Sequence, residues 1–223
     1  DPKSPVSEAY RALRTSLLYS KSIDNKGANV ILVSSPGPGE GKTTTISNLA
    51  ITYANLGLKT ILLDTDLRKP VAHKVFSIER DPGITKILSG LESDYSKIIK
   101  KSEIENLSII TSGITPPNPS EILASNKMKN LIDQLRSDFD VILLDAPPLL
   151  AVTDSFVIMQ YVDQFILVVR AGVTEKLALD RSIVQIKQTG SPLSGLVVNA
   201  VDSSNSYYSG YYNYYQSYYD DET

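Results

Sequence analysis

The stretch SSPGPGEGKTT, Ser34 to Thr44, decides the fold of this chain. It follows an apolar run at 30–33 and precedes a helical pattern at 46–50, which is the strand–loop–helix context of a phosphate-binding loop. Glycines let the backbone N–H groups approach a polyphosphate closely, and the N-terminus of the following helix attracts anions. We therefore predict a loop that binds a nucleoside triphosphate. Its predicted contact residues are Gly37, Gly39, Glu40, Gly41, Lys42, Thr43 and Thr44.

Two side chains of this loop have specific predicted roles. Lys42 is expected to reach the β- and γ-phosphates, and the Thr43 hydroxyl is expected to ligate Mg²⁺. One position departs from the general pattern, because Pro36 stands where the first glycine is usual. That position supplies the turn rather than the innermost contacts, so a proline is tolerable there. A surface turn rich in glycine and proline is the alternative, and Gly-Lys-Thr with two more glycines in register argues against it.

Length and composition restrict the class of protein. A chain of 223 residues suits one α/β domain, and 42% apolar residues allow a large core. The absence of cysteine excludes disulfides and thiolate metal sites, and a single histidine, His73, makes a histidine metal site improbable. A net charge of −3 gives no reason to expect a nucleic-acid partner. No apolar run has the length of a membrane span, and a cytoplasmic location fits these features.

Apolar runs alternate with helical patterns along the rest of the chain. Strands that are apolar throughout are buried on both faces, and their alternation with helices predicts an α/β fold with a doubly wound, mainly parallel sheet. The predicted strands are 30–33, 59–66, 107–111, 140–145, 165–169 and 196–198, and the predicted longer helices are 43–56, 120–135 and 174–189. Residues 112–119 contain three prolines in four positions and are expected to be irregular.

Three carboxylates are predicted to lie beside the phosphate loop. Asp64, Asp66 and Asp145 end two predicted strands, and ligands of such sheets bind at the carboxyl ends of the strands. We expect Asp145 to hold Mg²⁺ through water, opposite Thr43. Asp64 is expected to be a second metal contact and a general base that takes the proton of a hydroxyl nucleophile. A turn or helix cap is the alternative for Asp66.

Positive charge follows the second predicted strand. A tyrosine hydroxyl has a pKa near 10, so as a nucleophile at pH 7 it needs a base and nearby positive charge. Arg68 and Lys69 are expected to supply that charge or to attract an acidic segment that carries tyrosines. The predicted catalytic residues are Lys42, Asp64, Asp66 and Arg68.

The two ends of the chain differ in composition. The segment 203–223 holds eight tyrosines and nothing to build a core, so we predict a disordered or partner-docked tail that follows a domain at 1–202. The tyrosines are Tyr207, Tyr208, Tyr211, Tyr212, Tyr214, Tyr215, Tyr218 and Tyr219. Near the other end, Glu8, Arg11 and Arg14 share one face of a helix that Ser7 is predicted to cap. Spacing alone favours a solvated face for them.

Taken together, these motifs resemble those of the bacterial tyrosine kinases (BY-kinases) of capsule and exopolysaccharide biosynthesis. The resemblance covers the chain from about residue 3 to its C-terminus. It rests on 38–43 as the Walker A loop, 61–68 as the Walker A′ motif, 141–148 as Walker B, Glu8-x-x-Arg11-x-x-Arg14 and the tyrosine cluster. The Walker A′ motif and the cluster are far more specific than the phosphate loop.

This resemblance implies a P-loop NTPase fold and a non-specific protein-tyrosine kinase that uses ATP and Mg²⁺. It implies autophosphorylation of the eight tail tyrosines in trans within a ring-shaped homo-oligomer, with Glu8, Arg11 and Arg14 at the interface. The absence of a span resembles the Gram-positive branch, in which a membrane protein's cytoplasmic tail activates a separate kinase at the inner face of the plasma membrane. A tyrosine phosphatase and substrates from the polysaccharide pathway are further implied partners. Asn199 resembles an asparagine that contacts adenine in related ATPases.

Two alternatives belong to other classes. A partition or septum-site ATPase would carry a lysine at the position of Gly37, which argues against it. A non-catalytic scaffold controlled by nucleotide would need no base, so the complete set of three aspartates argues against that function.

Overall fold

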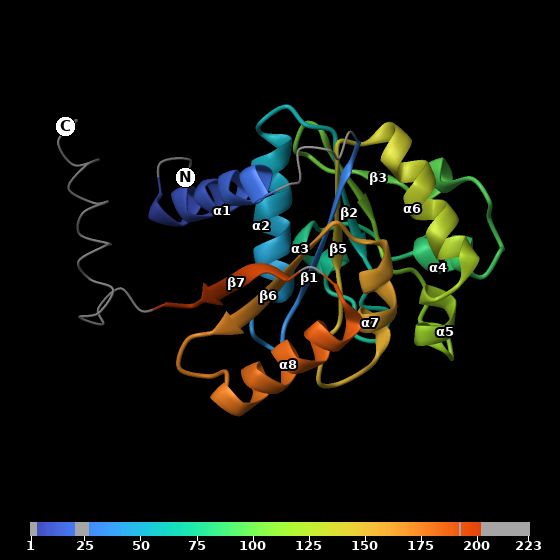
Figure 1. Ribbon diagram of the computed structural model, residues 1–223. Helices are drawn as coiled ribbons and strands as arrows, with labels where there is room; N and C mark the ends of the chain where they lie inside the picture. Colours follow the sequence, from blue (N-terminus) through green and yellow to red (C-terminus); the bar gives the residue numbers. More distant parts are fainter. Residues whose placement is uncertain (1–3, 21–26, 192, 202–223) are drawn as a thin grey trace, which may run out of the picture.

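A seven-stranded sheet forms the centre of this computed structural model, which describes residues 4–20, 27–191 and 193–201. The strand order is β3-β4-β2-β5-β1-β6-β7, and every pair of neighbours is parallel except β3 with β4 (Figure 1). The predicted α/β fold with a mainly parallel sheet is confirmed. The strands are β1 (Asn29–Ser34), β2 (Thr60–Asp64), β3 (Lys100–Lys101), β4 (Leu107–Ile110), β5 (Val141–Asp145), β6 (Gln164–Arg170) and β7 (Leu193–Asn199).

Helices cover both faces of the sheet. In the described residues, the α-helices are α1 (Pro5–Ser20), α2 (Lys42–Ala54), α3 (Ala72–Val75), α4 (Ile84–Leu88), α5 (Pro119–Leu123), α6 (Asn126–Asp138), α7 (Asp154–Ile158) and α8 (Lys176–Thr189). One core joins alternate strand residues to α1, α2 and α3, and the other core joins the remaining strand residues to α4–α8. Strand residues such as Ile31 and Leu32 are therefore fully buried on opposite faces, which explains why β1 is apolar throughout.

Two local predictions were wrong. The predicted helix at 120–135 is divided into α5 and α6 at Ser125, whose extended backbone (φ −74°, ψ 156°) interrupts the helix. Ser7 does not cap α1, because the helix begins at Pro5 and the Ser7 N–H donates to Ser4 Oγ at 3.2 Å. The short strand β3 was not predicted, since two consecutive lysines carry no strand pattern.

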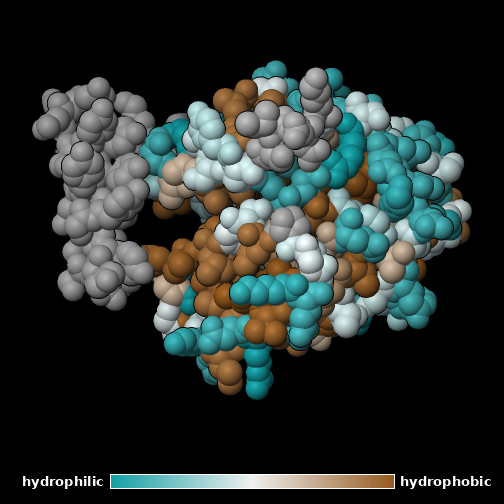
Figure 2. All heavy atoms as spheres, viewed as in Figure 1, coloured by the Kyte–Doolittle hydropathy of each residue, from teal (hydrophilic) through white to brown (hydrophobic). Residues whose placement is uncertain are grey.

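The face shown in Figure 2 is mixed in polarity. Exposed apolar side chains gather on the edge strand β7 and on α8, including Leu177, Val184, Leu196 and Val198 (Figure 2). No helix of the described part is long and apolar enough to cross a membrane. The predicted boundary at 202/203 and the eight tail tyrosines lie outside the described residues.

Candidate active site

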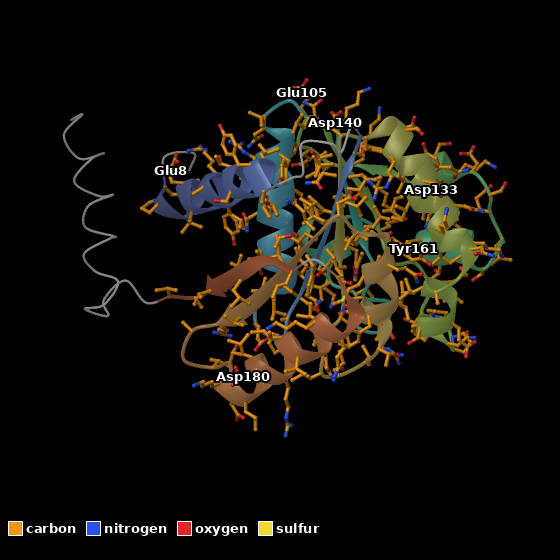
Figure 3. All side chains as sticks on the ribbon, viewed as in Figure 1. Glu8, Glu105, Asp133, Asp140, Tyr161 and Asp180 are labelled. Atoms are coloured by element: carbon orange, nitrogen blue, oxygen red, sulfur yellow. The ribbon has the colours of Figure 1, made fainter. Side chains whose placement is uncertain are left out.

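The carboxyl ends of the central strands bring the predicted motifs together. Asp64 of β2 and Val33 of β1 both lie beside Asp145 of β5, and the phosphate loop follows β1 directly. Asp140, directly before β5, marks the opposite, amino-terminal edge (Figure 3). A cavity of about 500 Å³ opens at the carboxyl edge. Its lining includes Gly39, Gly41, Lys42, Thr43, Thr44, Asp66, Arg68, Lys69, Val71 and Pro148.

The phosphate loop depends on glycine at two positions. Gly39 and Gly41 have φ values of 75° and 95°, a region that other residues rarely adopt. A Cβ atom on Gly41 would lie 1.9 Å from Asn199 Nδ2, so a side chain here would displace Asn199 from the loop. Asn199 donates from Nδ2 to the Glu40 carbonyl at 3.0 Å. The predicted adenine contact therefore lies against the loop backbone.

Glu40 is turned into the loop. Its carboxylate accepts from the Gly37 N–H at 2.8 Å and from the Thr174 hydroxyl, and the Arg170 guanidinium donates to the Gly39 carbonyl at 3.2 Å. Glu40 thus stabilises the loop from within. Thr174 and Arg170 lie far along the chain in no recognisable motif, so sequence analysis missed both.

Lys42 lies among carboxylates at the base of the cavity. Its Nζ is 3.0 Å from Asp66 Oδ2 and 3.5 Å from Asp145 Oδ1. Burial opposes the charged form of Lys42, but the charges of Asp145 and Asp66 outweigh it and raise the pKa of the lysine. The lysine is therefore a fixed positive charge at the point where a phosphate would approach the loop.

Thr43, Asp64 and Asp145 fit a magnesium ion. Thr43 Oγ1 donates to Asp145 Oδ2 at 2.6 Å, which places the hydroxyl and the carboxylate side by side. Asp64 Oδ1 is buried without a hydrogen bond, and Asp145 Oδ1 has only the ion pair with Lys42, so both oxygens are suited to a cation. No group of three or more acidic, histidine or cysteine residues that could hold a metal occurs in the described part of the chain. Mg²⁺ needs none, since one or two carboxylates and substrate phosphates usually hold it.

Asp64, the last residue of β2, and Asp66, two residues after it, have different environments. Asp66 lines the cavity, pairs with Lys42 and accepts from the Lys69 N–H at 3.0 Å, so it both turns the chain and faces the site. Asp64 is fully buried, and its Oδ2 accepts from the Ala72 N–H at 3.1 Å. Burial, with the charge of Asp145, raises the pKa of Asp64 to about 8. A pKa near the working pH suits a general base.

The raised pKa predicts a pH dependence of stability for the metal-free protein. The folded state holds the Asp64 proton more tightly than the unfolded chain, so this group stabilises the fold fully below pH 4. That stabilisation is lost as the pH rises through about 8, at up to about 1.4 kcal/mol per pH unit. We expect Asp64→Asn to flatten the profile and to be more stable than wild type at pH 8. Urea unfolding at pH 5–9 with a chelator measures this, and parallel profiles would contradict it.

Arg68 projects toward the cavity from the loop after β2. Its guanidinium forms an ion pair with Asp154, which is fully buried at the start of α7. Sequence analysis identified Arg68 but missed Asp154, because a carboxylate at the start of a helix usually indicates a cap.

The N-terminal motif lies elsewhere, on α1, and Glu8 lies where this helix projects from the body (Figure 3). Glu8 pairs with Arg11 within the helix, and Arg14 Nη1 donates to the Thr52 carbonyl of α2 at 2.8 Å. A cavity of about 430 Å³ between α1 and α2 is lined by Arg11, Arg14 and Tyr10 among others. The motif is thus not a purely solvated face.

Comparison with known proteins agrees with this geometry. Residues 28–189 match the family model described as an AAA domain. Tyrosine-protein kinase CpsD of Streptococcus pneumoniae serotype 4 is 40% identical over 202 residues, which are 90% of this chain and 87% of CpsD. Tyrosine-protein kinase YwqD of Bacillus subtilis is 37% identical over 95% of this chain and 88% of YwqD. This chain belongs to the bacterial tyrosine kinases.

Solved structures of the family have the same fold. The chimerical protein CapA2B2 superposes with a TM-score of 0.85 at 34% identity, covering 90% of this chain and 87% of the chimera. The kinase domain of Escherichia coli tyrosine kinase ETK gives 0.87 at 31% identity, covering 92% and 80%. A septum-site-determining protein from Pyrococcus horikoshii gives 0.68 at 22% identity, which shows a common fold only. The chain groups with short kinases of the CapB and CpsD type.

Proposed function

We propose that this protein is an ATP-dependent protein-tyrosine kinase that phosphorylates its own C-terminal tyrosines in trans and regulates capsular or extracellular polysaccharide synthesis and export. In the transfer, the tyrosine oxygen forms a bond to the γ-phosphorus of ATP, the bond from that phosphorus to the bridging oxygen breaks, and ADP leaves. The tyrosine proton passes to a carboxylate of the site. The observation that carries this proposal is that Lys42, Thr43 and Asp66 line one cavity. Behind them, the buried Asp145 contacts Lys42 and Thr43, and the buried Asp64 lies beside Asp145.

Each side chain of the site has a distinct role in this proposal. The loop amides from Gly39 to Thr44 and the Lys42 ammonium bind the phosphates in this proposal. Asn199, which donates to the Glu40 carbonyl, is the proposed adenine contact. Thr43, Asp64 and Asp145 would hold Mg²⁺, which neutralises phosphate charge when bound. Asp64 accepts the tyrosine proton, Asp66 holds Lys42, and Arg68 contributes positive charge at the cavity. These roles follow the chemistry of phosphoryl transfer, which depends on positioning and charge.

Incubation with labelled ATP and detection of phosphotyrosine tests the proposed function. We expect label on the tail tyrosines, and its loss after deletion of 203–223. Release of inorganic phosphate without phosphotyrosine would instead favour an ATPase switch, and nucleotide-dependent assembly without either product would favour a scaffold.

The proposed partners act outside the site. We propose activation by the cytoplasmic tail of a membrane protein, at the inner face of the plasma membrane, and reversal by a tyrosine phosphatase. Proteins of the polysaccharide pathway are the proposed further substrates. The solved relative CapA2B2 is, by its name, a chimera of a CapB-type chain with a second protein, and this supports a protein partner. The exposed apolar side chains on β7 and α8 support it too, because clustered exposed apolar residues mark interaction sites (Figure 2).

Assembly gives a further prediction. We propose that the unphosphorylated protein forms a closed ring through Glu8, Arg11 and Arg14, with each tail at a neighbour's active site. Each phosphotyrosine adds about −1.5 to −2 charges. The tail segment 202–223 already holds four acidic residues and no basic residue. Repulsion between neighbouring phosphorylated tails is therefore expected to release monomers.

Solution masses of four samples test the ring. Lys42→Met protein is expected to be oligomeric, whereas phosphorylated wild type and Arg11→Ala/Arg14→Ala are expected to be monomeric. Since Arg14 also contacts α2, the single variant Arg11→Ala separates an interface effect from loosening of α1. Equal masses for all samples would mean that the motif does not make an interface.

A further inference from the structure

Arg68 is a long side chain that the structure holds in one place. It lies in the loop after β2, lines the cavity beside the phosphate loop, and keeps 41% of its side chain exposed. A half-exposed arginine has many rotamers, and fixing one of them costs conformational entropy. Some contact must therefore set the direction of its guanidinium.

Asp154 makes that contact. Arg68 Nε donates to Asp154 Oδ2 at 2.8 Å, and Arg68 Nη2 donates to Asp154 Oδ1 at 3.1 Å. Two parallel hydrogen bonds fix both the position and the plane of a guanidinium. This pairing uses the Nε–Nη2 edge of the group, so the Nη1 side faces away from the carboxylate.

Ser120 completes the arrangement from a third element. Its hydroxyl donates to Asp154 Oδ1 and lies 3.4 Å from Arg68 Nη2. Ser120 belongs to α5, which packs beside α7 (Figure 1). Asp154 is therefore held by a second hydrogen bond that does not depend on Arg68.

A buried carboxylate is an expensive way to stabilise a fold. Asp154 has no exposed surface, and a well-packed apolar residue at such a place is often as stable or more stable. Its charged partner is not buried but reaches the cavity. A buried carboxylate that pairs with an arginine at the cavity is what a positioning role requires, and packing alone does not explain this arrangement.

We infer that Asp154 is a positioning residue for phosphoryl transfer, which holds the Arg68 guanidinium at the cavity with its Nη1 side available to the transferring phosphoryl group. Ser120 orients Asp154 for this task. The inference rests on the proposed kinase function.

A double-mutant cycle tests the inference. Phosphotransfer to Lys42→Met protein, which serves as acceptor, is measured over a range of ATP for wild type, Asp154→Asn, Arg68→Ala and the double variant. We expect Asp154→Asn to lower kcat about 10²-fold, the usual cost of misplacing a group by about 1 Å, with KM for ATP nearly unchanged. In the Arg68→Ala background the same change is expected to have no further effect on kcat.

Ser120→Ala gives a second, milder probe that leaves the ion pair in place. Ser120→Ala is expected to lower kcat in the wild-type background and not in the Arg68→Ala background. If Asp154→Asn fails to fold, this comparison tests the positioning role in its place. Wild-type kcat in Asp154→Asn, or losses that multiply in the double variant, would overturn the inference. Absence of phosphotyrosine in wild type would instead overturn the kinase function.

Asp163→Asn is the matched control. Asp163 forms a similar two-bond pair with Arg136, at 2.8 and 3.2 Å, at the amino-terminal edge of the sheet. We expect this variant to unfold at a lower temperature and to keep the wild-type kcat. An equal loss of kcat in Asp163→Asn and Asp154→Asn would mean that both act through stability alone.

Discussion

Replacement of Lys42 by methionine is expected to abolish phosphotyrosine formation while the protein remains folded. Lys42 Nζ lies 3.0 Å from Asp66 and 3.5 Å from Asp145, at the base of the phosphate loop. Methionine has a similar length but no charge, so it removes the phosphate contact. Loss of one such electrostatic contact costs about 10²–10³-fold in rate. Anti-phosphotyrosine detection after incubation with MgATP measures the effect, and circular dichroism verifies the fold.

The structure also predicts a loss of stability in Lys42→Met, which the sequence did not show. Lys42 neutralises the buried carboxylate of Asp145, whose pKa is raised by burial, so Lys42→Met is expected to be less stable at pH 8 than at pH 6, where Asp145 is more easily protonated. Lys59→Met is the matched control, since Lys59 is an exposed lysine at the opposite edge of the sheet. A Lys42→Met protein that still phosphorylates its own tail would contradict the assignment of the loop.

Replacement of Asp64 is the second large effect. Asp64→Ala is expected to lose about 10²–10⁴-fold in rate at saturating ATP and Mg²⁺, because excess metal cannot replace a positioned base. Asp64→Asn is the gentler variant, since its side-chain carbonyl can still accept from the Ala72 N–H, which lies 3.1 Å from Asp64 Oδ2. Initial rates of phosphotransfer at two Mg²⁺ concentrations measure both variants.

Magnesium dependence separates the two roles of Asp64. Full recovery of activity at high Mg²⁺ would mean that Asp64 is a metal ligand only. Asp66→Asn is measured in parallel, because Asp66 is the residue of the pair that lines the cavity. Asp140→Ala is the control, since Asp140 also accepts one backbone N–H beside a strand, at the amino-terminal edge. Greater loss in Asp66→Asn than in Asp64→Asn would assign the base to Asp66.

Sequence alone determined the architecture and most of the site. The apolar runs are long, local and separated by helical patterns, so burial on both faces leaves few arrangements other than a parallel sheet. Glycine spacing determined the loop between β1 and α2, because left-handed backbone at Gly39 and Gly41 is a local requirement. Motifs that act through a few consecutive residues can be recognised without any structure.

Only the tertiary structure decided how these side chains are paired. The division of α5 from α6 follows from backbone conformation at Ser125, which helical periodicity does not show. Asp64 and Asp66 are two residues apart, yet Asp64 is fully buried and Asp66 lines the cavity. The contacts of Glu40 with Thr174 and of Arg68 with Asp154 span 134 and 86 residues. Such contacts depend on how elements distant in the sequence pack together, and composition and motif spacing do not predict this packing.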